Sequence, residues 1–340
     1  MKNKNMMFRY LSVIVLTFCV FTASSQTLHV ASSPLYRCPV FDGAADPTVI
    51  YNRNEKSWWM LYTQRRANQD GADVAYVYGS NIGIASSSDH GETWVYRGAL
   101  NLAIEPGQNT FWAPEVVFDK GIYHMYVSYI QGVRNHWGGD KHILHFSSKD
   151  LWNWRFESQL PLSTNSVIDP CVFHLPDGKW RMWYKDEIQG SVSMVADSPD
   201  LYTWTVQKKP AVADRQHEGP NVFRFKDKYW MVVDQWAGLA VYSSDDCNSW
   251  TFNSVILDKA SRRNEDTPSG AHADVIVVKD QAYIFYFTHP GRKIHIDAPN
   301  GQNGVLPYDL RRSSIQVAEL KIIDNKMVCN RDEPFDFYLP

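Results

Sequence analysis

The sequence predicts an all-β fold: a five-bladed β-propeller with four antiparallel strands in each blade. Three observations predict it. A five-residue segment recurs five times, an alternating aromatic strand follows each copy, and a turn that ends in tryptophan closes four of the five units. Successive copies lie 50 to 67 residues apart, which is enough chain for four short strands and their turns.

The recurring segment opens each unit and is the predicted innermost strand of its blade. Its second residue is proline in four copies and alanine in the fifth. The copies are Asp46–Ile50, Ala113–Val117, Asp169–Phe173, Gly219–Phe223 and His272–Ile276.

The second strand and the closing turn follow in order. The second strands read SWWMLYTQ, GIYHMYVSY, KWRMWYKD, KYWMVVDQ and QAYIFYFT, and their period-2 alternation of apolar, β-branched and aromatic residues indicates strands. The closing turns read SSSDHGETW, SSKDLWNW, DSPDLYTW and SSDDCNSW. In such a turn we expect the aspartate to accept backbone N–H groups and the tryptophan to cover the neighbouring strand.

Composition narrows the class of protein. The chain has 340 residues, 44% of them hydrophobic and 14% aromatic, which excludes a disordered chain. A formal net charge of −3 argues against a nucleic-acid partner. Length alone would suggest about two domains. Because the five units fill nearly the whole of residues 26–340, we predict that these residues form one domain. We also predict that the protein is a monomer.

Residues 1–25 have the three parts of a secretory signal: a basic start, an apolar run and small residues before the cleavage point. The apolar run, Leu11–Phe21, is shorter than the roughly 20 residues that span a bilayer. Cys19 would suit a lipoprotein, but Phe18 is bulky where a small residue is expected. The sequence therefore predicts cleavage and release, to the periplasm or outside the cell, with no membrane span.

Four cysteines remain in the mature chain: Cys38, Cys171, Cys247 and Cys329. None shows the CxxC spacing of a zinc site. Cys38 and Cys329 lie near opposite ends, so a disulfide between them would clasp the fold, while free buried thiols are the alternative.

Carboxylates recur at the start of the innermost strands. Asp46 and Asp169 hold the first position of the repeated segment, and Glu218 immediately precedes it. Because innermost strands of a propeller open onto one mouth, we expect these three groups in one pocket. Like charges brought together raise at least one pKa, and two carboxyl groups across a scissile bond are the equipment of glycoside hydrolysis.

The ordered set of segments resembles the blade motifs of glycoside hydrolase family 43 over roughly residues 40–320. The segments that carry the resemblance are Ala45-Asp46-Pro47, Trp112-Ala113-Pro114-Glu115, Ile168-Asp169-Pro170 and His217-Glu218-Gly219-Pro220. The resemblance implies a five-bladed inverting glycosidase that acts on arabinofuranosides, xylosides or galactans. Its partner would be an oligosaccharide or polysaccharide.

The resemblance also implies roles for individual residues. Asp46 would be the general base, Asp169 the group that modulates the pKa of the acid and orients it, and Glu218 the general acid. Inversion requires room for a water, so we expect the carboxyl groups of Asp46 and Glu218 roughly 6.5–9.5 Å apart. No cofactor is implied for catalysis, but His272 corresponds to a family histidine near a central calcium or water; a buried, hydrogen-bonded histidine is the alternative.

Substrate contacts are harder to predict. Trp112, Trp137 and Trp236 lie beside blade starts or in loops and are candidates for stacking on sugar rings, although tryptophans more often pack in the core. Arg65 and Arg66 follow the second strand of the first blade, where one guanidinium would suit a carboxylated sugar and a solvated basic loop is the alternative.

Two other functions stay open. One is a related propeller activity, either a neoagarobiose-type hydrolase or a mannoside phosphorylase, and a phosphorylase would need several cationic side chains near Asp46 or Glu218. The other is a propeller that binds glycans without cleaving them. We expect a glycosidase that removes terminal pentose or galactose from plant polysaccharide fragments.

Overall fold

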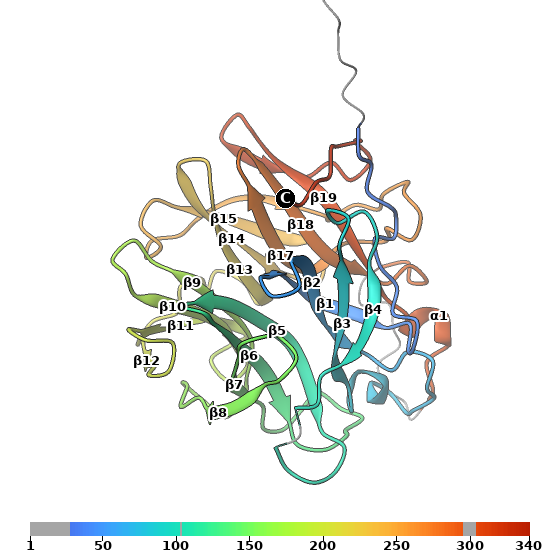
Figure 1. Ribbon diagram of the computed structural model, residues 1–340, viewed down its shortest axis with the longest axis vertical. Coiled ribbons are helices and arrows are strands. Elements are labelled where there is room, and N and C mark those ends of the chain that lie inside the picture. Colours follow the sequence, from blue (N-terminus) through green and yellow to red (C-terminus); the bar gives the residue numbers. More distant parts are fainter. Residues whose placement is uncertain (1–27, 103, 295–303) are drawn as a thin grey trace, which may run out of the picture.

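The computed structural model describes residues 28–102, 104–294 and 304–340. The predicted signal segment, residues 1–25, lies outside the described residues. Twenty strands form five antiparallel sheets, each of four consecutive strands (Figure 1). The predicted five-bladed β-propeller is confirmed.

Each blade contributes its strands in chain order. The first blade holds β1 (Ala44–Asn52), β2 (Ser57–Gln64), β3 (Asn81–Ser87) and β4 (Val95–Ala99). The second holds β5 (Thr110–Asp119), β6 (Ile122–Ile130), β7 (His142–Ser148) and β8 (Arg155–Gln159). The third holds β9 (Val167–His174), β10 (Trp180–Asp186), β11 (Val192–Ser198) and β12 (Thr205–Val206). The fourth holds β13 (Glu218–Phe225), β14 (Lys228–Asp234), β15 (Leu239–Ser244) and β16 (Thr251–Ile256). The fifth holds β17 (Ala271–Val278), β18 (Gln281–Thr288), β19 (Ser314–Ile323) and β20 (Lys326–Val328).

The repeated segment forms the same backbone feature in every blade. The register between the first and second strands shifts at this segment in all five sheets. The first residue of each copy has a positive φ: Asp46 49°, Ala113 45°, Asp169 58°, Gly219 54° and His272 26°. A bulge of this kind bends the strand and re-aims one side chain. Asp46, Asp169 and His272 hold this bulge position in the first, third and fifth blades.

The closing turns behave as expected. In the second blade the Asp150 carboxylate accepts the backbone N–H groups of Trp152 and Asn153, and the Trp154 indole donates to the Leu151 carbonyl. The corresponding tryptophans of the first and third blades make the same bond to the residue three positions earlier. These bonds stabilise the turn that leads into the outermost strand of each of these three blades.

The apolar core lies between blades. The innermost strands β1, β5, β9, β13 and β17 contact one another around the ring. Five hydrophobic clusters fill the spaces between adjacent blades, and each draws its side chains from both. Most of the aromatic content therefore builds the fold.

Both ends of the described chain close the ring. The cluster between the fifth and first blades includes Leu35 and Tyr36 from the N-terminal side and Phe335, Phe337 and Leu339 from the C-terminal side. The backbone N–H of Leu339 donates to the His90 carbonyl, and the Trp58 indole donates to the Pro340 carbonyl. The two ends thus act as a wedge between the last blade and the first.

The disulfide considered between Cys38 and Cys329 is absent: both are free thiols, as are Cys171 and Cys247. Cys38 packs in the cluster between the fifth and first blades, whereas Cys329 packs against the cluster between the fourth and fifth. Separation into different inter-blade cores explains why the two sulfurs do not meet.

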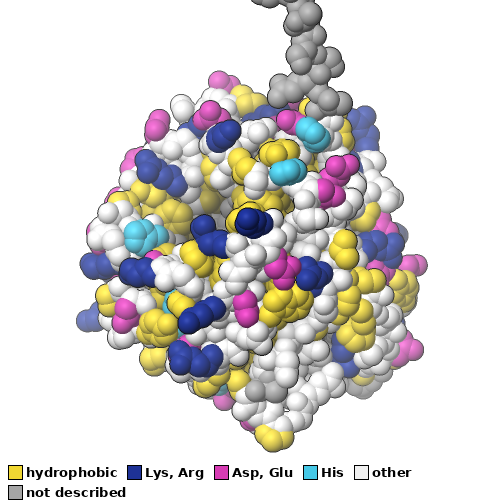
Figure 2. All heavy atoms as spheres, viewed as in Figure 1, with side chains coloured by type: hydrophobic (Ala, Val, Ile, Leu, Met, Phe, Trp, Pro, Cys, Tyr) yellow, Lys and Arg dark blue, Asp and Glu magenta, His cyan; other side chains and the backbone are white. Residues whose placement is uncertain are grey.

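Helix is confined, among the described residues, to the 3-10 turn η1 (Ala75–Val77) and the short α1 (Tyr308–Arg311). No helix in the described part of the chain is long and apolar enough to cross a membrane. On the face shown in Figure 2, basic and acidic side chains are interspersed with apolar ones.

Candidate active site

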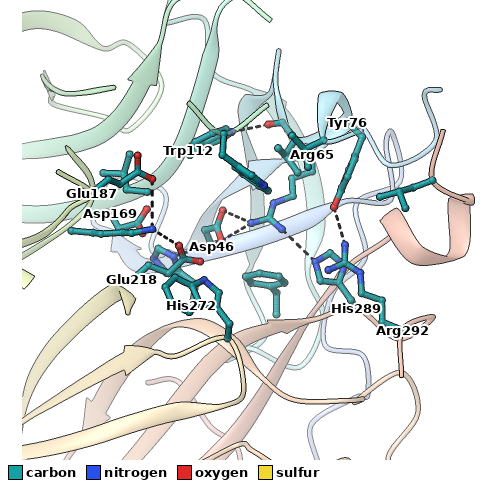
Figure 3. A pocket seen from close by; sticks show the side chains of 18 residues that line it. Asp46, Arg65, Tyr76, Trp112, Asp169, Glu187, Glu218, His272, His289 and Arg292 are labelled. Carbon is teal, nitrogen blue, oxygen red and sulfur yellow. Dashed lines mark hydrogen bonds and ion pairs between the residues drawn. The ribbon is translucent and has the colours of Figure 1, made fainter. Parts of the chain in front are cut away.

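A cavity of about 470 Å³ opens where the innermost strands begin. All five blades line it, and Figure 3 shows the side chains that point into it. The predicted residues that line it are Asp46, Arg65, Trp112, Trp137, Asp169, Glu218, Trp236 and His272. Repeat register therefore brings eight of the nine predicted site residues to one place.

Arg66 is the exception. Its guanidinium donates to the backbone carbonyls of Tyr78 and Ala75 and to the Gln69 side chain, and it does not line the cavity. Adjacent residues at the end of a strand point to opposite sides, so only Arg65 turns inward. Arg66 instead holds the η1 loop, whose Tyr76 and Val77 form part of the cavity wall.

Asp46 is buried and paired with Arg65. The Arg65 Nη2 lies 3.1 Å from Asp46 Oδ1 and 3.2 Å from Oδ2. The guanidinium stacks over the Phe287 ring at 4.6 Å, and its Nη1 lies 3.4 Å from His289 Nε2. These contacts fix the carboxylate orientation.

Asp169 is buried beside the other carboxylates. Its backbone N–H donates to Ser128 Oγ at 2.9 Å, and its Oδ2 accepts the Gly219 N–H at 3.1 Å. Burial raises the pKa of Asp169 to about 6; the positive charge of His272 opposes the rise, and the negative charge of Glu218 adds to it. Asp169 thus has the raised pKa that we expected for at least one of the predicted carboxyl groups.

Glu218 has the opposite electrostatics. Its Oε2 accepts a hydrogen bond from Lys185 Nζ at 2.9 Å. Burial would raise the pKa of Glu218, but the Lys185 charge and hydrogen bond, aided by His272 and the Trp236 side chain, lower it to about 2. Without a bound ligand Glu218 is therefore ionised.

His272 lies among the carboxylates. Its Nδ1 is 3.7 Å from Asp46 Oδ1, and its backbone N–H donates to Asp234 Oδ2 at 3.0 Å. Burial opposes protonation, but the charges of Asp169, Asp46, Glu218 and Asp234 outweigh it and raise the pKa of His272.

The tryptophans differ in exposure. Trp112 is buried, and its indole donates to the Val77 carbonyl at 2.7 Å, whereas Trp137 is 53% exposed at the rim. Their rings meet edge to face at 6.2 Å. Trp236 has a φ of 60°, and its ring lies 5.4 Å from Lys185 Nζ. Trp137 is thus the most exposed of the three predicted tryptophans.

Sequence reasoning missed several residues of the site: Lys185, Glu187, His289 and Arg292 line the cavity, and Asp234, which does not line it, accepts the His272 N–H. Strand pairing supplies the signal that finds most of them. The second-strand residue opposite the position just before each bulge is Thr63, Ser128, Lys185, Asp234 or Phe287. Two residues further on stand Arg65, Ile130, Glu187, Trp236 and His289, four of which line the cavity.

That second-strand position has a structural role in three blades. Thr63 Oγ1 accepts the N–H of Ala113, Ser128 Oγ accepts that of Asp169, and Asp234 Oδ2 accepts that of His272. In each case a side-chain acceptor holds the bulge of the next blade. The third blade has Lys185 instead, which carries no acceptor.

Two further carboxylates lie on the innermost strands and do not line the cavity. Glu115 Oε1 accepts the Val172 N–H, and Asp274 Oδ2 accepts the Val49 N–H. They tie neighbouring innermost strands together and so have a structural role.

The calcium implied at His272 does not fit this arrangement. Among the described residues, no group of three or more His, Cys, Asp or Glu side chains is placed to hold a metal ion. The nearby carboxylates Asp46 and Glu218 already have cationic partners in Arg65 and Lys185, and His272 itself is drawn toward its protonated form.

A propeller whose mouth holds separate buried carboxylates within walls of aromatic and basic side chains has the layout of a carbohydrate-cleaving enzyme that works with two carboxyl groups. The sequence model of glycosyl hydrolases family 43 matches residues 88–289. This match covers more than half of the chain, so the chain belongs to glycosyl hydrolases family 43 and is a glycosidase.

Solved structures agree on the fold. A family 43 β-xylosidase/α-arabinofuranosidase from a compost microbial metagenome, in complex with xylotriose and calcium-free, shares 15% identity at a TM-score of 0.63 and covers 87% of this chain and 96% of its own. A family 43 subfamily 1 enzyme from Xanthomonas citri, complexed with xylotriose, shares 16% at 0.61, covering 88% and 92%. An exo-1,5-α-L-arabinanase from a bovine ruminal metagenomic library shares 14% at 0.56, covering 87% and 99%. No curated protein matches the sequence of this chain.

Proposed function

We propose that this glycosidase acts with inversion and removes terminal pentose or galactose units from plant polysaccharide fragments. Asp46 is the general base, Glu218 the general acid, and Asp169 orients the acid and modulates its pKa. The observation that carries the proposal is the meeting of these three carboxyl groups, from three blades, in one cavity of about 470 Å³. Walls from all five blades favour a chain end over an internal unit.

The reaction follows from the carboxyl groups of Asp46 and Glu218. Asp46 takes a proton from a water molecule while the water oxygen bonds to the anomeric carbon. The glycosidic C–O bond breaks, and the leaving oxygen receives the proton of Glu218. The products are a sugar of inverted configuration and a shortened alcohol, and proton exchange with solvent restores both carboxyl groups.

Pentose specificity is supported by the names of three similar structures: a β-xylosidase/α-arabinofuranosidase, a β-xylosidase and an exo-1,5-α-L-arabinanase. Trp137 at the rim suits the unit that leaves, because aromatic faces stack on sugar rings. Arg65 is committed to Asp46, so it serves the base and not a carboxylated sugar.

The test is a screen of 4-nitrophenyl glycosides and of arabino-, xylo- and galacto-oligosaccharides, with the first-formed anomer observed by NMR. We expect turnover of a pentoside or galactoside, an inverted product, and loss of turnover in Asp46→Asn with an unchanged circular dichroism spectrum. A retained anomer, or a wild-type rate in Asp46→Asn, would contradict the proposal. Asp177→Asn, which changes an exposed carboxylate in the turn between β9 and β10 that does not line the cavity, is the matched control.

Phosphorolysis is a second candidate, favoured by one observation. Arg65, Lys185 and Arg292 line the cavity, and Arg65 and Lys185 pair with Asp46 and Glu218. A phosphate oxygen would then replace water at the anomeric carbon, and the product would be a sugar 1-phosphate. Product analysis by ³¹P NMR, with and without inorganic phosphate, separates the two: hydrolysis without phosphate dependence excludes phosphorolysis.

We also propose export after cleavage behind Ser25, on the basis of the signal pattern in residues 1–25. Sequencing the N-terminus of the exported protein tests this, and a start at Gln26 is expected.

A further inference from the structure

Lys185 is a buried cation between two carboxylates. Its Nζ lies 2.9 Å from Glu218 Oε2 and 3.6 Å from Glu187 Oε1. The side chain is only 7% exposed, and the Trp236 ring lies alongside the ammonium group. Both carboxylates line the cavity, so the ammonium group stands at the site of reaction.

The fold itself does not call for a lysine at this position. Equivalent positions in three other blades carry acceptors that hold the next bulge: Thr63, Ser128 and Asp234. In the third blade the N–H of the next bulge, that of Gly219, is held by Asp169 instead. A buried charge without this structural role points to a role in the chemistry.

The resting ion pair conflicts with the reaction. A general acid has to carry a proton, whereas an ammonium group at hydrogen-bond distance stabilises the carboxylate. The low pKa of Glu218, about 2, agrees with this geometry. Protonation of Glu218 therefore requires Lys185 to weaken its bond to that group.

Glu187 is arranged as the alternative partner. Its Oε2 accepts from Ser166 Oγ at 2.8 Å and from Lys141 Nζ, while its Oε1 faces Lys185. A movement of roughly 1 Å would bring Lys185 Nζ to hydrogen-bond distance from that oxygen. No backbone movement is needed for so small a change.

Glu187 is also linked to the rim of the cavity. Lys141, which is fully buried, donates both to Glu187 and to the Trp137 carbonyl. Trp137 belongs to the rim that a bound sugar would meet. Occupation of the cavity can therefore be transmitted through Lys141 to Glu187.

We propose that Lys185 is a positioning residue with two partners: it pairs with Glu218 in the free enzyme and moves to Glu187 when a glycoside fills the cavity. Glu218 can then hold the proton that it gives to the leaving oxygen. The proposal rests on the proposed function, because it takes Glu218 as the acid.

The other groups around the pair bear on its titration. The other titratable groups that interact with Glu218 or Lys185 are Asp169 on β9, His217 just before β13, Asp234 on β14 and His272 on β17. Since the proposed movement leaves these four groups in place, substitution of Glu187 isolates the second partner of Lys185.

The experiment compares the pH dependence of kcat/KM, which reports the free enzyme, with that of kcat, which reports the complex. The substrate is the 4-nitrophenyl glycoside that the wild type cleaves fastest. In the wild type the alkaline limb of kcat should lie at least one pH unit above that of kcat/KM. In Glu187→Gln the gap should close, because Lys185 has no second carboxylate. In Lys185→Met both limbs should lie at higher pH and coincide.

A readout without turnover accompanies the kinetics. Carboxyl ¹³C shifts of labelled glutamate, with the Glu218 signal assigned through Glu218→Gln, follow the titration of Glu218 directly. Lys185→Met should raise its midpoint by more than one pH unit, while Lys228→Met, which removes a surface lysine paired with Asp245, should leave it unchanged.

The outcomes are distinguishable. Equal gaps between the two limbs in the wild type and in Glu187→Gln, with normal turnover, would overturn the two-partner proposal alone. An unchanged Glu218 midpoint in Lys185→Met would overturn it as well. A wild type without turnover on any glycoside would overturn the proposed function, and the proposal with it.

Discussion

One nitrogen of the Arg65 guanidinium, Nη2, lies within 3.1 Å and 3.2 Å of the two carboxylate oxygens of Asp46. The two residues come from the first and second strands of one blade, so the blade carries both the predicted base and the group that orients it. The same guanidinium is held in turn by Phe287 and His289 of the fifth blade. The orientation of Asp46 therefore depends on contacts across the junction that closes the ring.

Replacement of Arg65 should slow the reaction more than it weakens binding. In Arg65→Met the buried Asp46 loses its hydrogen-bond partner and its fixed orientation, and we expect kcat to fall about 10- to 100-fold with KM changed far less. Steady-state kinetics measures both. Arg155→Met, which removes an exposed guanidinium, is the control. A rise in KM at constant kcat would show instead that Arg65 binds the sugar.

Replacement of Glu218 should have an effect that depends on the leaving group. Glu218→Gln removes the proton donor, so glycosides with a poor leaving group should slow by roughly 10²- to 10⁴-fold. A 2,4-dinitrophenyl glycoside needs little protonation and should keep most of its rate. Kinetics on a series of aryl glycosides gives the slope. Equal losses across the series would contradict the assignment of Glu218 as the acid.

The raised pKa of Asp169 predicts a pH-dependent stability. Burial holds this pKa at about 6 in the folded protein, above the ordinary value of an aspartate. The folded state therefore binds the Asp169 proton more tightly than the unfolded state does. This proton binding stabilises the fold fully at a pH below the ordinary pKa of aspartate, and the stabilisation is lost as the pH rises through about 6.

Asp169→Asn tests this sign. The neutral amide still accepts the Gly219 N–H, so its stability should not fall over the same pH window. The free energy of unfolding of the variant minus that of the wild type should therefore be larger at pH 7 than at pH 4.5. The increase should be at most about 3 kcal/mol. Urea unfolding followed by circular dichroism measures the difference; a difference independent of pH would contradict the raised pKa.

Phe337→Ala should loosen the closure of the ring. The Phe337 ring is buried and packs edge to face on Tyr283 at 5.1 Å and on Phe285 at 6.0 Å. Loss of a buried phenyl ring from a packed core should lower the free energy of unfolding by about 3 kcal/mol. Phe252→Ala, at a half-exposed ring of β16, should cost much less in the same urea titration. Equal costs would mean that the C-terminal segment is not a structural wedge.

The fold was predictable because the signal repeats. Five copies of one bulge-forming segment place Asp46, Asp169 and His272 at equivalent positions, and the bulge brings all three to the mouth. A single Asp-Pro pair would have had no such meaning. The comparison among copies, rather than any one motif, carried the prediction.

The electrostatics of the site was not predictable from the same positions. Lys185 and Asp234 occur on second strands, where the register of the pairs has to be known before the copies can be aligned. As long as Lys185 is not known to be a neighbour, the proximity of carboxylates predicts a raised pKa for Glu218. Only the contact with Lys185 explains why the pKa of Glu218 is lowered instead. Arg65 and Arg66 likewise cannot be told apart until the end of β2 is placed.

The bulge at the mouth is a backbone feature shared by five positions that carry Asp, Ala, Asp, Gly and His. The fold thus has five equivalent bulge positions, and the side chain at each position decides whether that position takes part in chemistry. The second blade has Ala113 at this position, and because its side chain is a methyl group, that blade contributes no acid or base there. In such a propeller, substitution of a single residue at one bulge position can change the chemistry of the site without any change in the path of the backbone.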